Sequence, residues 1–583
     1  MGKQPQEKNG GSDAADDVLQ NTSKEEIEKL AAGDIEVNAN LTVYVALACL
    51  VAASGGVLFG YDAGCTGGVE TMKQFAEMWF PATASKTDTS FYCKFNDKTL
   101  QAYSAVMHFT GAVASLFAGY ITQRFGRTTS MIVAGTSYIA GSILQAAASK
   151  SIGMLFAGRI CWGIGVGFGD HCAFIYTAEM APPQWRGRLN SMVQTGTFLG
   201  LVVASAINVG TNYLVWGWRL SLGLAAVPGA ILLLGGIFLP NTPNSLVERG
   251  NPEKAKAVLR RVRGTKDVDT EFKSILVANK VMENMENPWR AIIRRKNIPQ
   301  LTLAIMMPLL QQWSGVNAVS FFSPQIFAGV AAFSGGHAGN EGQLFAALLV
   351  NAVQLVSNIV CIIFVDKVGR RTLLISGSIL GLLADYAVAI VFAVTYAGGA
   401  ALPQTGSLAA IILICLYGVS FGFSWGPIGW LVPSEIHDLN TRSAGQSITV
   451  FTQLISGAIV TQVFLMMMCT MKYGVFIFFG AWQTIALIFV LFFLPETRGV
   501  PIERSAQHVR SHWFWRKVAY KNGVIPDEDK PPRDKKEIEM DGKHANAGSK
   551  NNRGRANGAA NGNGKHQVHD PTENDHVSRS NAA

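Results

Sequence analysis

Ionisable side chains stand inside apolar stretches of this chain, where their burial is costly. Asp62 follows Gly60 and Tyr61 at the outer end of the first apolar run, and Arg159 lies within a later one. A carboxylate between a cation and an apolar surface can change protonation state, because the cation favours the anion and loss of water favours the acid. The two residues could therefore bind and release a proton, or form a static ion pair.

Uncharged amides make up a second group of polar residues. Gln311, Gln312 and Asn317 lie in one apolar stretch that a glycine interrupts. Amides both donate and accept hydrogen bonds, which suits sugar hydroxyls, whereas a carboxylate substrate would call for cations. Gln194 and Trp430 could complete a pocket, with the ring of Trp430 covering the CH groups of a sugar. The alternative is hydrogen bonding between helices.

These residues lie in twelve apolar stretches, each long enough for a membrane-spanning helix of about 20 residues. The composition agrees, because 49% of the 583 residues are hydrophobic and only 15% are charged. We expect helices at 41–61, 103–121, 128–148, 152–176, 189–210, 218–239, 299–324, 344–365, 372–396, 408–433, 443–468 and 474–494. The sequence therefore predicts an all-α membrane protein.

The twelve stretches form two sets of six, and the same pattern of polar residues separates the stretches in both sets. The recurring residues are Gly126 and Gly369 in basic loops, Glu179 and Glu435, and Pro240 and Pro495. The offsets are 369 − 126 = 243, 435 − 179 = 256 and 495 − 240 = 255. Three matches at nearly one spacing indicate a duplicated unit, and duplicated membrane halves are typical of transporters with a substrate site near the bilayer midplane.

Loop charges and composition predict the orientation and the domains. Loops after even-numbered stretches carry far more Lys and Arg residues than the short loops after odd-numbered ones, so both termini should be cytoplasmic. The same bias explains the net charge of +9 better than nucleic-acid binding does. The polar tails should be disordered. We expect an N-tail at 1–40 and an N-terminal bundle at 41–239, with an extracellular lid at about 66–102. A cytoplasmic linker at 240–298 should contain a short helix from Pro252 to Arg261. A C-terminal bundle at 299–498 and a mostly disordered cytoplasmic C-tail at 499–583 should follow.

Two of the eight cysteines differ from the others. Cys93 falls in the long loop after the first helix and Cys469 at the outer end of the eleventh, so both should lie on the oxidising side, where a disulfide could tie the lid to the C-terminal half. Topology alone leaves that bond open. The others should be small buried residues: Cys49, Cys65, Cys161, Cys172, Cys361 and Cys415.

Taken together, the motifs resemble the sugar porter branch of the major facilitator superfamily. They are Gly60-Tyr61-Asp62, the basic loops around Gly126 and Gly369, Glu179 with Arg186, Glu435 with Arg442, Gln311-Gln312, and Pro495-Glu496-Thr497. Three segments resemble in particular the plant and green-algal monosaccharide/proton symporters: Phe91 to Phe95, Pro240 to Leu246 and Trp430 to Glu435. The resemblance covers about residues 40 to 505 and implies a fold of two pseudo-symmetric six-helix bundles.

The resemblance also implies roles for matching residues. Asp62 matches a proton acceptor and Arg159 its partner, and Cys93 with Cys469 matches a disulfide of the extracellular lid. The expected sugar contacts are Gln194, Gln311, Gln312, Asn317, Asn351, Gln354, Trp430, Thr449 and Gln453, with Phe59 and Phe95 closing over the sugar. The expected network that locks the halves at the cytoplasmic face comprises Arg124, Arg127, Glu179, Arg186, Asp366, Arg370, Arg371, Glu435, Arg442 and Glu496.

Several positions depart from the family pattern. Gln354, with Asn351 one turn away, and Thr449 with Gln453 stand where asparagines are usual, and Ala63 is smaller than its usual counterpart. Such changes alter the reach of a pocket by about a methylene, which is enough for roughly 1–3 kcal/mol of discrimination between sugars. Glucose is the expected substrate, with galactose, fructose or a pentose as alternatives.

A further departure is Asp170-His171, where amides are usual. We expect this dipeptide near the outer end of the fourth helix, in a solvated outer vestibule. His108 and Asp385 also lie within apolar stretches, and the sequence assigns them no role.

The sequence as a whole predicts a proton-coupled monosaccharide symporter that works by alternating access as a monomer. The plasma membrane is the expected location, with the vacuolar or another organelle membrane as the alternative. An uncoupled facilitative carrier is the alternative, although it would need no titrating group at Asp62. A sugar sensor that signals through the C-tail is a further one. No nucleophile and base, phosphate loop or metal-ligand spacing indicates an enzyme. The expected partners are a monosaccharide, a proton as coupling ion and the lipid bilayer, with no nucleic acid, cofactor or metal.

Overall fold

The computed structural model describes residues 41–84, 91–283, 287–327, 340–395, 404–438, 440–498, 500 and 502–520. Throughout these ranges the regular structure is helical, and no strand occurs in them. The N-tail expected at 1–40, most of the C-tail expected from 499, and residues 85–90 of the expected lid lie outside the described residues.

The first half of the chain contributes what we call the N-terminal set. Its helices are α3 (Val43–Thr71), α6 (Lys98–Phe125), α7 (Arg127–Ala146), α8 (Ile152–Met180), α9 (Arg186–Thr211) and α10 (Gly217–Leu224), which continues as α11 (Ala226–Phe238). Side chains at the helix starts explain several boundaries. Asp97 accepts hydrogen bonds from the backbone N–H groups of Thr99 and Leu100 at 2.8 and 3.0 Å, and Ser151 caps α8 in the same way at 3.2 Å.

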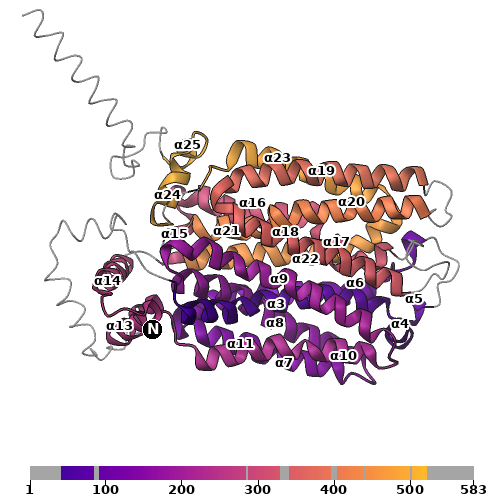
Figure 1. Ribbon diagram of the computed structural model, residues 1–583, viewed down its shortest axis with the longest axis horizontal. Helices are drawn as coiled ribbons and strands as arrows, with labels where there is room; N and C mark the ends of the chain where they lie inside the picture. The colour runs from indigo at the N-terminus through magenta and orange to yellow at the C-terminus, as the bar shows by residue number, and fades with distance from the viewer. Residues whose placement is uncertain are drawn as a thin grey trace, which may run out of the picture. The chain divides into compact units, whose positions relative to one another are not determined.

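The second half contributes the C-terminal set, drawn from magenta to yellow in Figure 1. Its members are α16 (Ile298–Gln311), the π-helical turn η4 (Gln312–Val316), α17 (Asn317–Ile326), α18 (Asn340–Val368), α19 (Arg370–Thr395), α20 (Gln404–Phe423), α21 (Trp425–Glu435), α22 (Arg442–Met471) and α23 (Gly474–Phe493). Gly315 has φ 96°, a left-handed conformation that glycine tolerates, and this breaks the seventh span at η4.

Ten of the described helices are long and apolar enough to cross a membrane. The other two predicted spans correspond to α7, which carries many Ser, Thr and Tyr side chains, and to the interrupted unit α16–η4–α17. The prediction of an all-α membrane protein with twelve spans is confirmed, and most predicted bounds lie within a few residues of the observed ones.

The first span is longer than predicted, because α3 runs to Thr71 and not only to residue 61. Its second half is rich in glycine, which reads as a loop in the sequence. A Cβ atom at Gly60 would lie 1.8 Å from the carbonyl oxygen of Thr197, and one at Gly64 would lie 2.6 Å from that of Leu201. The glycines therefore allow close approach of the backbones of α3 and α9. Asp62 consequently lies inside the helix and not at its outer end.

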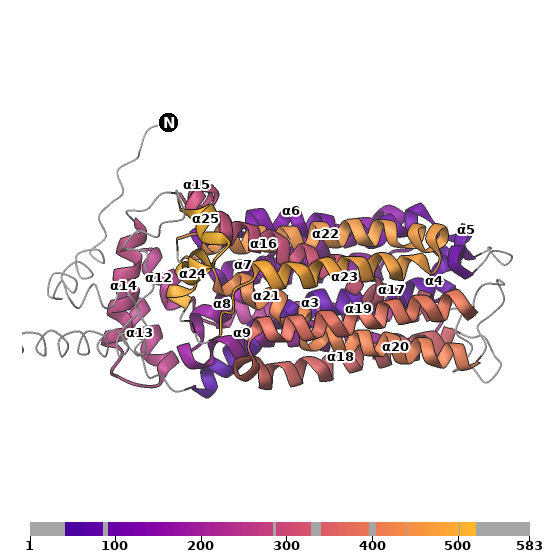
Figure 2. The same cartoon turned by 90° about the horizontal axis from the view of Figure 1, so that it is seen from above.

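We name the two ends of the helices by what they carry. The lid end carries α4 (Lys73–Trp79), α5 (Pro81–Ala84) and η1 (Phe91–Cys93), at the right of Figure 1. The linker end carries η2 (Pro183–Trp185), α12 (Pro243–Glu248), α13 (Pro252–Arg263), α14 (Asp269–Glu283), α15 (Pro288–Ile293) and η3 (Arg295–Asn297), at the left of Figures 1 and 2.

The linker helices bury a small apolar cluster of their own, which includes Val247, Leu259 and Phe272. The predicted helix from Pro252 is α13. It ends at Arg263, and the next residue, Gly264, adopts a left-handed conformation.

The first part of the segment expected to be mostly disordered forms two short helices, α24 (Ile502–Ser511) and α25 (Trp515–Ala519). Trp515 Nε1 donates to the carbonyl oxygen of Phe493 at 2.7 Å, and the ring of Phe514 packs at 4.6 Å from that of Phe493. Aromatic side chains thus anchor this part of the chain against α23, which composition over the whole tail did not reveal.

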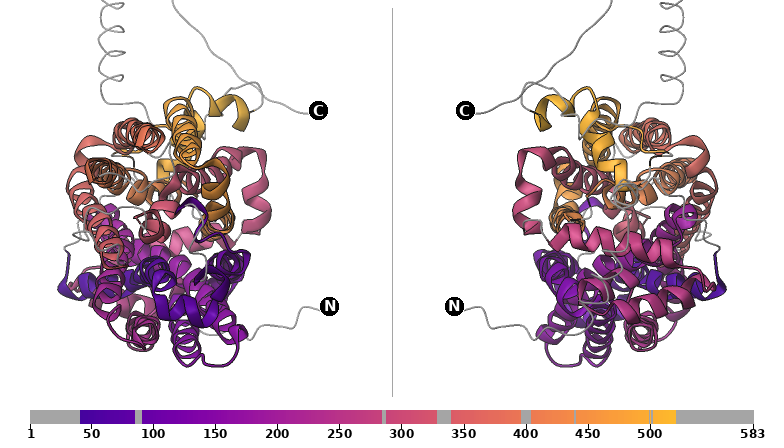
Figure 3. Two further views of the ribbon diagram at one scale, coloured as in Figure 1. Left: turned by 90° about the vertical axis from the view of Figure 1, so that its right-hand side faces the viewer. Right: turned by 90° about the vertical axis from the view of Figure 1, so that its left-hand side faces the viewer.

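The two sets of helices meet mainly along three pairs, which are α6 with α22, α9 with α18, and α3 with α17. Figure 3, seen along the helices, shows the N-terminal set on one side and the C-terminal set on the other. Residues on these facing helices form the site described next.

Candidate functional site

An ion pair joins α3 and α8 within the N-terminal set. Arg159 Nη1 donates to Asp62 Oδ1, and both side chains are 0% exposed. Thr66 Oγ1 donates to the same oxygen at 2.8 Å, and Arg159 Nη2 donates to Thr66 Oγ1 at 2.5 Å. The structure thus brings together the two residues that the sequence singled out. Asp62 Oδ2 has no hydrogen-bond partner in the described part of the chain.

Aromatic rings surround the guanidinium group of Arg159. Its Cζ atom lies 4.2 Å from the centre of the Tyr103 ring and 5.2 Å from that of Trp162. Aromatic faces stabilise a cation without neutralising it. Asp62 therefore remains the only carboxylate paired with Arg159 among the described residues.

Amide atoms without partners gather in the C-terminal set. Gln312 Oε1, Asn317 Nδ2, both amide atoms of Gln354 and Gln453 Oε1 are buried and have no hydrogen-bond partner among the described residues. Buried polar atoms are normally paired, so this concentration indicates groups that a polar ligand or water can satisfy. Gln354 lies against α20, where a Cβ atom at Gly418 would be 3.2 Å from its Cγ.

Residues from four helices and both sets meet around Gly457 of α22. A Cβ atom on this glycine would lie 2.9 Å from both Asn317 Nδ2 and His108 Cδ2. The His108 ring packs edge to face with Phe59 at 5.8 Å and lies 5.0 Å from Phe321. Aromatic faces beside unpaired polar atoms are the combination that a sugar ring and its hydroxyls require.

The sequence assigned His108 no role. In the structure, neither of its ring nitrogens has a hydrogen-bond partner among the described residues. Its position depends on how α6 is rotated against α22, which a single sequence does not reveal.

Gln311 and Trp430 already have contacts in this structure. Gln311 Nε2 donates to the carbonyl oxygens of Trp425 and Gly426 at 2.8 and 3.1 Å, at the break between α20 and α21. The Trp430 ring stacks on Phe174 of α8 with 4.9 Å between ring centres. Gln311 therefore holds the start of α21 in place, and Trp430 contacts the opposite set.

The remaining predicted sugar contacts are more dispersed. Asn351 Nδ2 donates to Ser205 Oγ of α9 at 2.9 Å, and Thr449 Oγ1 donates to the Gly445 carbonyl of its own helix at 3.0 Å. Gln194 is buried on α9. Phe95 is buried in the lid, where the Lys94 ammonium lies 5.5 Å from its ring.

Carboxylates and arginines form two clusters at the linker end. Around the N-terminal set, Arg127 binds Glu179 through two hydrogen bonds of 2.7 and 3.0 Å and Glu248 of α12 through two of 2.7 and 3.2 Å. In the C-terminal set, Arg370 Nη2 lies 3.5 Å from Glu435 Oε1.

Other members of the predicted network have varied contacts. The backbone N–H groups of Arg370 and Arg371 donate to Glu496 at 3.0 and 3.1 Å, so Glu496 caps α19. Arg186 and Arg442 line a small cavity together with Glu435. Arg124 donates to the Tyr120 hydroxyl at 2.5 Å and has no carboxylate partner among the described residues.

The linker end also joins the two sets directly. Arg188 Nε lies 3.4 Å from Asp366 Oδ2, and Asn190 Nδ2 donates to Ser434 Oγ at 2.9 Å. His437 is buried nearby, between α21 and α22. Burial lowers the pKa of His437 to about 3, and the charge of Arg442 contributes to that decrease.

The predicted position of Asp170 and His171 is wrong. Both are buried, and they lie in the half of α8 that leads to the linker end, where the Met180 carbonyl accepts a hydrogen bond from Arg263 at 2.9 Å. His171 Nδ1 lies 3.5 Å from Ser447 Oγ of α22. The fourth helix runs from the lid end to the linker end, so its later residues cannot reach an outer vestibule.

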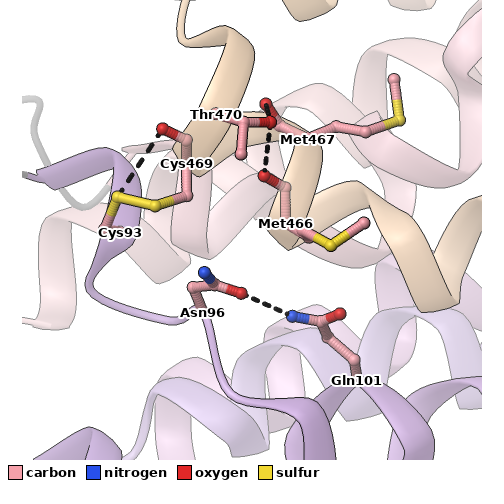
Figure 4. The surroundings of a disulfide bond; sticks show 7 residues. All are labelled: Cys93, Asn96, Gln101, Met466, Met467, Cys469 and Thr470. Carbon is pink, nitrogen blue, oxygen red and sulfur yellow. Dashed lines mark hydrogen bonds between the residues drawn. A yellow bond between two sulfur atoms is a disulfide. The ribbon is translucent and has the colours of Figure 1, made fainter.

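At the lid end, Cys93 and Cys469 form the disulfide that the resemblance implied. Figure 4 shows how it joins η1 to the end of α22, across 376 residues of sequence. Nearby, Gln101 Nε2 donates to Asn96 Oδ1 at 3.0 Å. The bond therefore attaches the lid to the C-terminal set.

Comparison with known proteins supplies the family. Residues 48–508 match the family model described as "Sugar (and other) transporter". The chain belongs to this sugar transporter family. Similar proteins include Sugar transport protein 7 of Arabidopsis thaliana, 43% identical over 85% of this chain and 96% of the relative, and Sugar carrier protein A of Ricinus communis, 43% identical over 83% and 92%. A member of this family is a transporter and not an enzyme.

Solved structures of the same fold agree. The proton:xylose symporter XylE of the major facilitator superfamily, bound to 6-bromo-6-deoxy-D-glucose, aligns with a TM-score of 0.67 at 23% identity, over 81% of this chain and 99% of XylE. Inward-open XylE from E. coli aligns with a TM-score of 0.61 at 22% identity, over 79% and 99%. The predicted major facilitator fold is thereby confirmed for this sugar transporter.

Proposed function

We propose that this sugar transporter is a symporter that couples proton entry to uptake of a monosaccharide, with a hexose, glucose first, as substrate. The observation that carries the coupling is the fully buried Asp62–Arg159 pair, in which Asp62 Oδ2 has no partner in the described part of the chain. An ionisable pair inside a membrane is costly and is therefore a functional candidate by default. XylE, a proton:xylose symporter, supports the same assignment by analogy of fold.

The proposed sugar site lies between the two sets. Gln312, Asn317 and Gln453 offer unpaired amide atoms to hydroxyls, while Phe59 and Trp430 offer aromatic faces from opposite sets. Gln194, Gln311, Asn351, Gln354, Thr449 and Phe95 complete the proposed set of contacts. An amide both donates and accepts, so these groups can bind a neutral polyol without a charged partner.

Coupling follows from the geometry of Asp62. A proton arriving on its free oxygen removes the negative charge that holds Arg159, so the guanidinium keeps only Thr66 and its aromatic neighbours. The α3–α8 contact then weakens, and the N-terminal set can change its packing. Alternating access requires such a step, with the sets moving as units that correspond to 41–239 and 299–498 about the linker 240–298.

We place the linker end in the cytoplasm and the lid end outside, in the plasma membrane. The linker end carries the Lys/Arg-rich segment, as cytoplasmic loops do, and the disulfide at the lid end suits an oxidising side. The cytoplasmic gating network then comprises the Arg127 and Arg370 clusters and the Arg188–Asp366 contact. We expect the carrier to work as a monomer, without a cofactor.

Uptake of labelled glucose into proteoliposomes tests the proposal, with and without an inward proton gradient. The wild type should accumulate glucose above equilibrium only with the gradient. Asp62→Asn should abolish accumulation, because the neutral amide takes up no proton at this position.

If glucose only equilibrates across the membrane, with or without the proton gradient, the wild-type protein is an uncoupled carrier. Binding without uptake would indicate a sensor. Galactose, fructose and xylose, tested in parallel, would identify another substrate if glucose is not transported.

A further inference from the structure

A second carboxylate lies in the same helix as Asp62, in the last turn of α3 at the lid end. Glu70 follows Asp62 by eight residues and is 2% exposed. The first predicted helix ends at residue 61, before Glu70, and the sequence assigns Glu70 no role. Glu70 is buried because α3 continues to Thr71.

The contacts of Glu70 come from both sets of helices. Glu70 Oε1 forms a hydrogen bond with Ser104 Oγ of α6, and Glu70 Oε2 accepts one from Gln325 Nε2 of α17 at 3.2 Å. Gln325 Nε2 is also 3.2 Å from the carbonyl oxygen of Gly67. Glu70 therefore lies where the N-terminal and C-terminal sets close on each other at the lid end.

The carboxylate of Glu70 has neutral hydrogen-bond partners, whereas that of Asp62 is paired with a cation. Ser104 and Gln325 are neutral, and in the described part of the chain no Lys or Arg side chain forms an ion pair with Glu70. The charged or titratable groups that act on it from further away are Arg159 of α8, Asp62 of α3 and the Tyr103 hydroxyl of α6, and Arg159 is already paired with Asp62. A carboxylate buried with neutral donors alone is more costly than a buried carboxylic acid.

The hydrogen bonding of Ser104 accommodates both forms of Glu70. Ser104 Oγ lies 3.1 Å from the Leu100 carbonyl oxygen as well as next to Glu70 Oε1, and a hydroxyl has one hydrogen. When Glu70 is an anion, Ser104 donates to Glu70. When Glu70 is an acid, Glu70 donates to Ser104 and Ser104 donates to Leu100. Both arrangements are complete without movement of heavy atoms.

We propose that Glu70 is a second proton-binding carboxylate of this transporter and that it takes up a proton when the lid end closes. The proton comes from water on the lid side, adds to one Glu70 oxygen and leaves the group neutral, while the Ser104 hydroxyl turns from Glu70 to Leu100. The transport cycle thus requires a proton at Glu70 for closure of the lid end, in addition to the proton proposed at Asp62. This inference rests on the proposed function, because it presumes transport that passes through a closed state.

Equilibrium exchange of labelled glucose tests it in proteoliposomes containing the full chain, with equal pH on both sides between about pH 6 and about pH 9. If the exchange cycle needs both protons, the wild-type rate should fall by about a hundredfold per pH unit at the alkaline limit, and Glu70→Gln should reduce this to about tenfold, because one titrating group is lost. Glu77→Gln is the matched control. Glu77 lies in the lid, its side chain is 55% exposed and it pairs with Lys73, so its profile should match that of the wild type.

Infrared spectroscopy supplies a second readout that does not need transport. The wild type should show the C=O band of a buried carboxylic acid that Glu70→Gln lacks. Equal pH slopes for wild type and Glu70→Gln would overturn the proposal. If the variant exchanges no glucose, absence of a difference band between the two folded proteins would overturn it equally. A wild type that exchanges no sugar would instead contradict the proposed function, and the infrared band would still decide whether Glu70 holds a proton.

Discussion

The lid end and the linker end join the two sets of helices by different chemistry. At the lid end, the sets share the Cys93–Cys469 disulfide and the buried hydrogen bond from Gln325 to Glu70. At the linker end, Arg188 and Asp366 approach each other with side chains that are 42% and 33% exposed. Ion pairs with that much exposure contribute only about 0–1 kcal/mol each. The linker end can therefore separate at low cost, whereas the lid end keeps a covalent tether.

This difference bears on how the transporter can move. The disulfide attaches the lid of the N-terminal set to α22 of the C-terminal set, so one corner of the lid end stays closed while the rest opens. At the linker end, the Arg188–Asp366 and Asn190–Ser434 contacts can be exchanged for contacts with water. A bundle that rocks about a fixed corner would open more widely at the linker end than at the lid end.

The largest expected effect comes from removal of the tether. Cys93→Ser should lower the free energy of unfolding by about 2–5 kcal/mol, because the disulfide no longer restricts the unfolded chain. Thermal unfolding in detergent measures this. Cys161→Ser is the control, since Cys161 is a half-buried free thiol and its loss should change the stability little. Equal unfolding temperatures for wild type and Cys93→Ser would contradict the importance given to the lid end.

Acid should lower the stability of the fold through His437 at the linker end. The pKa of His437 is lowered by burial from 6.5 to about 3, so the folded protein excludes a proton that the unfolded chain binds. Its contribution to stability is complete above about pH 6.5 and is lost at about 1.4 kcal/mol per pH unit as the pH falls towards 3.

Unfolding measured between these pH values should show a shallower dependence for His437→Gln than for the wild type. Cys93→Ser should retain the wild-type slope, because a disulfide does not titrate. The same slope in His437→Gln as in the wild type would place the acid sensitivity elsewhere.

The smallest effect is expected at the rim of the linker end. A double-mutant cycle with Arg188→Ala and Asp366→Ala should give a coupling energy of about 0–1 kcal/mol, because both side chains are partly hydrated. The cycle is needed because Asp366 also lies 3.1 Å from Arg370. A coupling energy above roughly 2 kcal/mol would mean that the linker end is held as firmly as a buried ion pair and would remove the contrast between the ends.

The fold was predictable to the extent that apolar length defines a membrane helix. The prediction failed at the end of α3, because glycines that indicate a loop in a soluble protein serve close packing inside a membrane. It also missed α24 and α25, since the aromatic anchor Trp513 to Trp515 is short beside the polar tail that follows it.

The site was predictable where a polar side chain stood in an apolar run or matched a family motif. Asp62 with Arg159 and Cys93 with Cys469 were found in these ways, and the structure contains both contacts. The predicted position of Asp170 was wrong. The fourth helix runs from the lid end to the linker end, so its later residues lie away from the lid end. The surroundings of Glu70 depend on which faces α3, α6 and α17 turn towards one another, and no spacing in the sequence specifies that.

The glycines of α3 also determine where this protein can vary. A single added carbon at Gly60 would lie 1.8 Å from the backbone oxygen of Thr197, and one at Gly56 would lie 2.1 Å from that of Val193. Because backbone atoms cannot move aside as a side chain can, this face tolerates no other residue. Changes of substrate preference in this protein would therefore have to come from residues on other faces, because any side chain added along this seam would force α3 and α9 apart.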